Sequence, residues 1–110
     1  MIEKVQLPDN YYLQVIPDTW DNNIKVHLID PISDMQTVLA VFENGRWKSE
    51  YIRNLDRFFE ILKMYPKVRA AIKRSFTYLR NAELGPYMDV VTFTKTLARQ
   101  VNVNLYKLIH

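Results

Sequence analysis

The first half of the chain alternates apolar and polar positions with the period of a β-strand. Residues 11–16 (YYLQVI) and 24–28 (IKVHL) carry apolar side chains at every second position, with more polar residues between them. The segment between them, 17–23 (PDTWDNN), is rich in turn-forming residues. This pattern predicts two antiparallel strands joined as a hairpin.

Residues 37–43 (TVLAVFE) are apolar at successive positions, which is typical of a central strand covered on both faces or covered by a helix. Asn44 and Gly45 follow, a pair that favours the type I′ turn of a hairpin. Residues 46–52 then resemble a return strand. The first 53 residues are therefore expected to form an antiparallel sheet of three to four strands.

The period changes to that of a helix after Asn54, which we interpret as an N-cap. Apolar residues recur at helical spacing, namely Leu55, Phe58, Phe59 and Leu62. Pro66 disfavours helical geometry at the residue before it and suits a first helical turn. Two helices are expected, over 54–64 and 66–82.

Gly85 and Pro86 end the second helix, and the segment 88–110 that follows keeps helical spacing. It is also rich in β-branched residues, so the pattern leaves helix and strand both open. Part of it resembles the middle of a helix-turn-helix, with Asn104 as the cap of a recognition helix. Only six residues follow Asn104, and a helix interrupted by asparagines is the better interpretation.

Together these elements predict an α+β fold in which the sheet packs against about three C-terminal helices. Because the chain has 110 residues, of which 48% are hydrophobic and 25% charged, we expect one domain over 1–110, mainly β over 1–53 and mainly α over 54–110.

The longest apolar run has five residues (38–42), so no membrane span is expected. The absence of cysteine excludes disulfides and thiolate metal sites. The N-terminus lacks the layout of a signal peptide, and a cytoplasmic location is expected.

The net charge of +3 conceals an uneven distribution along the chain. Residues 1–35 hold six acids and two lysines, a net charge of −4, whereas residues 36–80 hold ten bases and four acids, a net charge of +6. Such a division predicts a surface with a positive and a negative region.

The strongest positive signal is the predicted second helix. Its apolar side chains form one stripe: Val68, Ile72, Phe76 and Leu79. Basic and aromatic side chains lie on the two flanks, Arg69, Lys73 and Arg80 on one and Lys67, Arg74 and Tyr78 on the other. Because this helix contains no acid, its bases lack the partners within the helix that a purely structural surface helix usually carries. Asp56 and Glu60 on the preceding helix could neutralise part of this charge. Guanidinium groups suit phosphate oxygens, and a tyrosine ring offers a stacking surface for a base. The alternative is a solvated face whose long side chains cover the rim of the core.

The predicted hairpin adds three bases, Arg46, Lys48 and Arg53, to the same region of sequence. A basic two-stranded ribbon can enter a groove of DNA or follow a backbone. Trp47 and Tyr51 are instead expected in the core.

Residues suited to catalysis are few, and no enzyme activity is expected. His27 stands alone, no serine has the flanking glycines of a nucleophile elbow, and two glycines are too few for a phosphate-binding loop. We expect no cofactor and no metal.

The leading hypothesis is a small binding protein that engages nucleic acid, DNA or RNA, through the Arg46–Arg80 region. Its size and composition would suit an accessory protein of a phage or plasmid. The alternative is a protein-interaction or inhibitor module that uses the acidic strand and loop region with Asp18, Trp20 and Asp21, or a self-associating structural protein. A tryptophan in so polar a turn is typically either an interface anchor or a lid folded back over the core.

Overall fold

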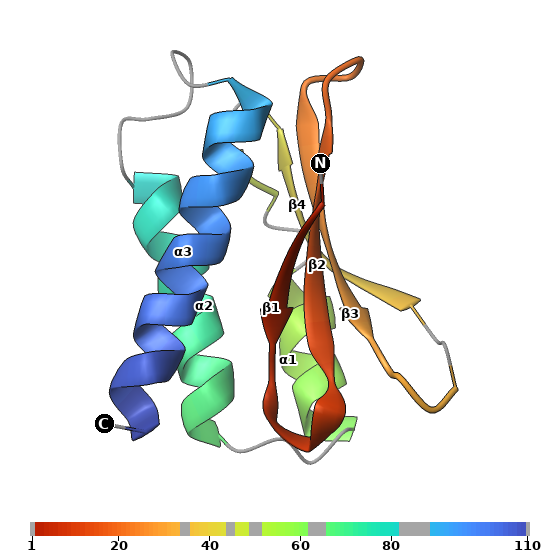
Figure 1. Cartoon of the computed structure of the whole chain (residues 1–110), viewed down its shortest axis with the longest axis vertical. Helices are drawn as coiled ribbons and strands as arrows, with labels where there is room; N and C mark the ends of the chain where they lie inside the picture. The colour runs from red at the N-terminus through yellow and green to blue at the C-terminus, as the bar shows by residue number, and fades with distance from the viewer. Residues whose placement is uncertain are drawn as a thin grey trace.

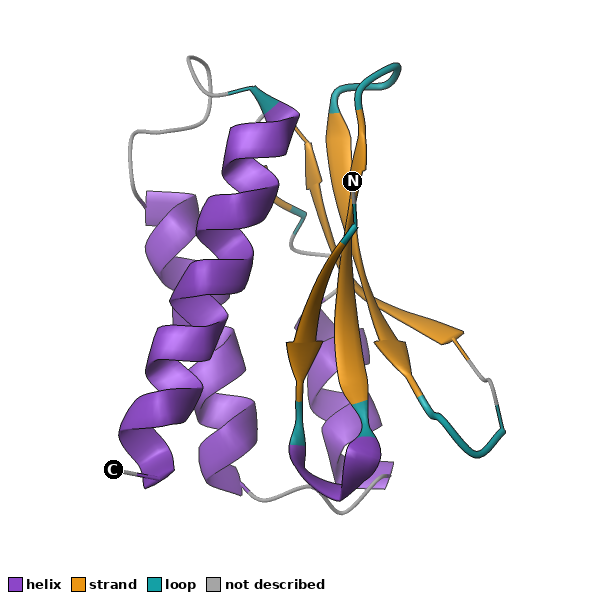
Figure 2. Ribbon diagram, viewed as in Figure 1, coloured by secondary structure: helices purple, strands orange, loops and turns teal. Residues whose placement is uncertain are grey.

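The computed structural model describes residues 2–33, 36–43, 46–48, 52–61, 66–81 and 89–109. The strands are β1 (Glu3–Gln6), β2 (Tyr12–Asp18), β3 (Asn23–Ile29), β4 (Gln36–Glu43) and β5 (Arg46–Trp47). The helices are α1 (Ile52–Ile61), α2 (Pro66–Asn81) and α3 (Val90–Ile109), and a short 3-10 turn covers Pro8–Asn10. The strands precede all three α-helices along the chain, as the α+β prediction requires (Figures 1 and 2).

The five strands form one antiparallel sheet in the order β1-β2-β3-β4-β5. Helix α3 packs over β1, β2 and β3, while α1 lies against β4 and α2 approaches β5. Helices α2 and α3 lie side by side, to the left of the sheet in Figure 1. Among the described strands, β1 and β5 are the two outer strands of the sheet.

The core lies between the sheet and the helices. Side chains that share a register on three or four strands point toward the helices, as in the row Val5, Leu13 and Leu28 and the row Ile24, Phe42 and Trp47. The ring of Phe76 on α2 lies 5.5 Å from that of Phe42 and 5.4 Å from that of Trp47. The inward position expected for Trp47 is thus confirmed.

A β-bulge explains two of the successive apolar positions in residues 37–43, Leu39 and Ala40. Val26 pairs with Ala40 and His27 pairs with Val38, so Leu39 is an extra residue on β4. Leu39 and Ala40 are both fully buried in the core. The bulge therefore places two successive apolar residues of β4 in the core, and α1 lies against this strand.

Three details differ from the sequence-based prediction. Strand β1 was not predicted, because Val5 is its only apolar residue and no alternation is visible in four residues. The part of the return strand that the structure describes ends at Trp47. Helix α1 begins at Ile52, so Asn54 lies inside the helix instead of capping it. The Asn44–Gly45 turn lies outside the described residues.

The C-terminal segment is one continuous helix, which settles the choice between helix and strand. Asn104 neither ends α3 nor begins a recognition helix, since α3 runs on to Ile109. Its amide Nδ2 donates a hydrogen bond to Ser75 Oγ at 2.7 Å, and both side chains are buried. An asparagine is tolerated in the helix because its polar group has this partner on α2. None of the described helices is long and apolar enough to cross a bilayer.

Candidate nucleic-acid interface

Helix α2 presents basic side chains on both flanks of its solvent face. Its buried stripe contains Val68, Ile72 and Phe76. Lys67, Arg69 and Arg74 are exposed, and Tyr78 is 56% exposed. The predicted division of this helix into a buried stripe and two flanks therefore agrees with the burial of these residues.

Small side chains separate the two flanks. Ala70 and Thr77 lie between them on the exposed midline of the helix, seven residues and thus about two turns apart. A shallow depression of about 540 Å³ follows this midline, lined by Ala70, Lys73, Arg74, Thr77 and Tyr78. A strand of phosphates could lie there with cations on each side. We call this surface, comprising Lys67, Arg69, Ala70, Lys73, Arg74, Thr77 and Tyr78, the α2 trough.

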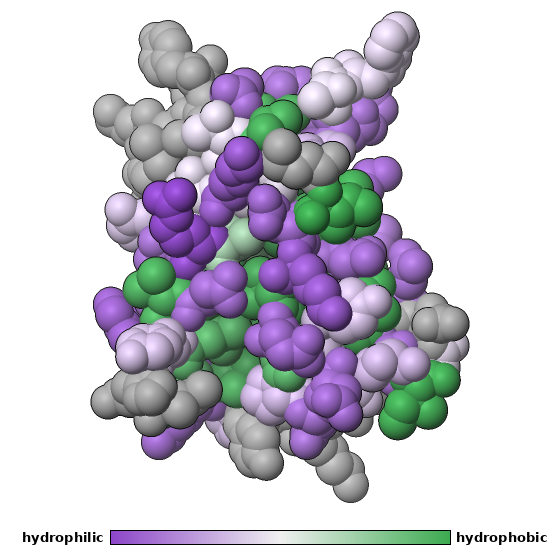
Figure 3. Space-filling view, viewed as in Figure 1, coloured by the Kyte–Doolittle hydropathy of each residue, from purple (hydrophilic) through white to green (hydrophobic). Residues whose placement is uncertain are grey.

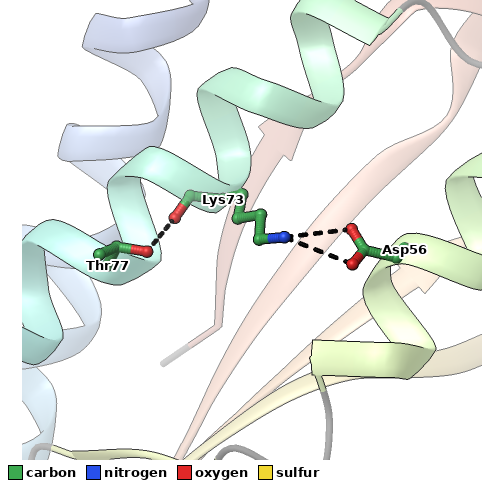
Figure 4. A network of polar contacts seen from close by, with 3 residues as sticks. All are labelled: Asp56, Lys73 and Thr77. Atoms are coloured by element: carbon green, nitrogen blue, oxygen red, sulfur yellow. Dashed lines mark hydrogen bonds and ion pairs between the residues drawn. The ribbon is translucent and has the colours of Figure 1, made fainter.

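One of these cations has an acidic partner from another helix. Lys73 Nζ lies 3.3 Å from Asp56 Oδ2 on α1, with 44% of each side chain exposed (Figure 4). The prediction that α2 carries no acid holds for its sequence, but packing against α1 supplies one to Lys73. A half-exposed pair of this kind is weak and is further weakened by salt. Lys73 is therefore a smaller contributor to the positive potential than Lys67, Arg69 or Arg74.

The predicted bases of β5 are placed apart from the α2 trough. Arg46 pairs in register with Glu43, and because side chains alternate along a strand it leaves the sheet on the face opposite to Trp47. Lys48 Nζ forms an ion pair with Glu43 Oε1 at 2.9 Å. The structure thus does not bring Arg46 onto the helix side of the sheet, and it gives Lys48 a carboxylate partner.

The other predicted bases lie on helices. Arg53 is exposed on α1, and Arg57, one turn later, is exposed as well. Arg57 was not among the predicted site residues, although its i+4 spacing from Arg53 is a signal for a shared helix face. Arg80 belongs to α2, and its side chain lies outside the described part of the chain.

Trp20 projects from the β2–β3 turn. Asp18 Oδ1 accepts hydrogen bonds from the backbone N–H groups of Trp20 at 3.0 Å and Asp21 at 3.1 Å, which fixes the turn. The Trp20 side chain is 93% exposed. Of the two roles considered for this residue, a lid over the core is wrong, whereas an interface anchor is compatible with its exposure. Asp18 is primarily a turn residue.

A second turn acid, Asp30, also stabilises the turn in which it lies. Asp30 accepts hydrogen bonds from the Ile32 N–H at 2.9 Å and the Ser33 hydroxyl at 2.8 Å, and these donors lower the pKa of its carboxyl group. Among the described residues, no three acidic or histidine side chains are grouped as metal ligands.

Comparisons with protein-family models, with curated proteins and with solved structures found no significant match to this chain. The chemistry of its surfaces is therefore what indicates its function.

Proposed function

We propose that this chain is a non-enzymatic binding protein that contacts the phosphate backbone of nucleic acid through the α2 trough. The observation that carries the proposal is the exposure of Lys67, Arg69 and Arg74 on the two flanks of the solvent face of α2, where Arg74 also lines an open depression. Among the described residues, none of these three cations forms an ion pair with a carboxylate. Their charge is therefore free to act on a polyanion.

The shape of the trough favours backbone contact over base readout. The exposed face of α2 has small residues at its centre, so a phosphate strand can approach closely. Long side chains reach it from both flanks. Tyr78 lies at one end of the depression and is free to stack on an unpaired base. A cytoplasmic location and an accessory role for a phage or plasmid belong to the same hypothesis and rest on the size and composition of the chain.

A binding assay with charge-matched variants tests the proposal. The test variant carries Lys67→Ala and Arg74→Ala, and the control carries Lys25→Ala and Arg46→Ala on the opposite face of the sheet. Each removes one lysine and one arginine, so the change in net charge is identical. Fluorescence anisotropy with a labelled duplex and a labelled single strand at low salt should show a loss of at least about tenfold in affinity for the test variant. Equal affinities for the two variants, or no binding by the unaltered chain, would refute it.

The exposure of Trp20 supports a second candidate function, a protein-interaction module. A nearly fully exposed tryptophan at the tip of a hairpin, beside the exposed carboxylate of Asp21, is the kind of side chain that anchors interfaces. If Trp20→Ala abolishes binding to a protein partner and leaves nucleic-acid binding unchanged, the hairpin and the α2 trough are independent sites.

A further inference from the structure

A second surface, distinct from the α2 trough, lies between the edge of the sheet and the third helix. A groove of about 760 Å³ is lined by Glu3 of β1 and by residues along one flank of α3. Figure 3 shows a hydrophobic depression between β1 and α3, bordered by hydrophilic side chains. We call this feature the β1–α3 groove.

The edge of β1 offers unpaired backbone groups to this groove. The Leu7 N–H donates to the Tyr11 carbonyl at 2.8 Å, directly after the last register pair Gln6 and Tyr12, so the backbone N–H of Leu7 is directed toward β2. Because hydrogen-bonded and non-hydrogen-bonded pairs alternate, Val5 and Glu3 also bond toward β2. The N–H and C=O groups of Lys4 and Gln6 therefore point to the free edge. No described strand pairs with that edge.

The helix side of the groove is partly apolar. Ala98 and Val103 line it together with the ring of Tyr106. Val103 is 42% and Tyr106 63% exposed, and Ile2, which directly precedes β1, is 55% exposed. Two of the seven exposed large apolar side chains on the described surface, Val103 and Tyr106, therefore line the groove, and apolar groups gathered in one depression are typical of an interaction site.

The charge of the groove is positive. Lys95, Arg99 and Lys107 line it, against Glu3 as the acid. Within the described ranges none of the three bases forms an ion pair, so the groove carries a net excess of two positive charges. Its natural complement is a segment with carboxylates.

We propose that the β1–α3 groove binds an extended acidic peptide segment, which adds to β1 as a sixth strand. A strand placed at the usual spacing of about 4.8 Å from β1 would bond to the backbone of Lys4 and Gln6. Every second side chain of that strand would enter the groove, where apolar residues contact Ala98 and Val103 and carboxylates meet Lys95 and Arg99. Affinity comes from the backbone bonds, and selectivity comes from the alternate side chains.

Two other occupants fit less well. A nucleic-acid backbone has no row of N–H and C=O groups to satisfy the edge of β1, and it does not match an apolar floor. A second copy of this chain pairing through its own β1 would bring the sequence Glu3–Gln6, which has one acid and one base and so does not complement the positive groove.

A peptide-display selection tests the proposal on the intact chain. Random twelve-residue peptides selected on the unaltered protein should become enriched in Asp and Glu, with apolar residues at alternate positions. A synthetic copy of the most enriched peptide should shift the backbone amide NMR signals of Lys4 and Gln6 and slow their exchange with solvent. Its affinity should fall at least about tenfold when Lys95→Glu and Arg99→Glu are combined, because like charges then face each other.

The matched control carries Lys25→Glu and Arg46→Glu, the same change in charge on the outer face of the sheet, and should bind as the unaltered chain does. A version of the peptide with N-methylated amides on its pairing edge should not bind. The proposal is overturned if the selection enriches no acidic peptides, if both charge variants bind equally, or if the N-methylated peptide retains its affinity. It is also overturned if duplex DNA, or self-association detected by sedimentation, shifts the same amides.

Discussion

At the scale of single residues, the buried contact between Ser75 and Asn104 is the polar link between α2 and α3. Ser75 Oγ donates to the Ala71 carbonyl at 2.8 Å and accepts from Asn104 Nδ2 at 2.7 Å. Its exposed fraction is 0%, and that of Asn104 is 6%. Each polar group has the other as its hydrogen-bond partner at a site that water does not reach, so burying the pair destabilises the core only slightly.

Removing one member of this pair should destabilise the protein more than removing both. Ser75→Ala leaves the Asn104 amide without its partner and is expected to lower the free energy of unfolding by about 1–3 kcal/mol. The double variant Ser75→Ala with Asn104→Leu replaces both polar groups and should recover part of that loss. Urea unfolding measures both. If the double variant equals the sum of the single variants, the two side chains do not interact as described.

Asp89 caps the N-terminus of α3. Its carboxylate accepts hydrogen bonds from the Thr92 N–H at 2.8 Å and the Thr92 hydroxyl at 3.0 Å. These bonds lower its pKa from the usual 3.8, with the backbone bond as the larger cause. A lowered pKa means that the stabilisation is fully present above pH 3.8 and is lost as the pH falls through the folded-state pKa.

The Asp89 cap therefore predicts that the melting temperatures of the unaltered chain and the Asp89→Asn variant differ by an amount that depends on pH. Asp89→Asn keeps an oxygen acceptor but cannot ionise, so it should melt at a lower temperature than the unaltered chain at pH 7. The difference should shrink as the pH is lowered below 3.8. Thermal melts at pH 7, 4 and 2.5 measure it, and a difference that stays constant across this range would contradict the role of the carboxylate.

The two tryptophans should contribute very differently to the free energy of unfolding. Trp47 is 5% exposed and packs on Phe76, so Trp47→Ala should lower the free energy of unfolding by about 3–5 kcal/mol. Trp20→Ala changes a side chain that is 93% exposed and should alter it by no more than about 0.5 kcal/mol. Denaturant titration of both variants checks this, and a large loss for Trp20→Ala would show that the side chain packs on the core.

At the scale of elements, the sequence predicts those strands and helices whose buried positions recur with a local period. The alternation of apolar and polar residues in β2 and β3 is a strong sequence signal, and so is the apolar stripe of α2. Both signals arise because one face of each element is buried. Strand β1 escapes prediction since only Val5 among its four residues is buried. The bulge at Leu39 was not predicted either, because a one-residue change of register is set by pairing with β3, and successive apolar residues are equally expected of a strand covered on both faces.

Some features of the candidate site also follow from local helix geometry, whereas others depend on packing between distant elements. The flanks of α2 follow from helix geometry, so Lys67, Arg69, Arg74 and Tyr78 could be grouped without a structure. The ion pair of Lys73 with Asp56 depends on how α1 packs against α2, across 17 residues of sequence. The separation of Arg46 from α2 depends on which side chain of β5 enters the core. The β1–α3 groove joins the two ends of the chain, which no local pattern connects.

At the scale of the whole molecule, the acidic and basic parts of the sequence occupy different places. Many acids of the first half lie in turns at the ends of the strands, including Asp9, Asp18, Asp21 and Asp30. The bases of α2 lie on the helix surface that faces away from the core. Packing of the sheet on the helices therefore buries neither set, and the division of charge seen in the sequence persists on the surface. A polyanion would approach the helix layer first.

The salt dependence of nucleic-acid binding tests the central claim, phosphate contact by the α2 trough, most directly. On duplex DNA, log K should fall linearly with log salt concentration, with a slope of about −0.9 for each phosphate that is neutralised. The variant with Lys67→Ala and Arg74→Ala should bind with a slope shallower by up to about 1.8, whereas Lys25→Ala with Arg46→Ala should leave the slope unchanged. A slope that is the same in all three proteins, or binding that does not respond to salt, would contradict the account.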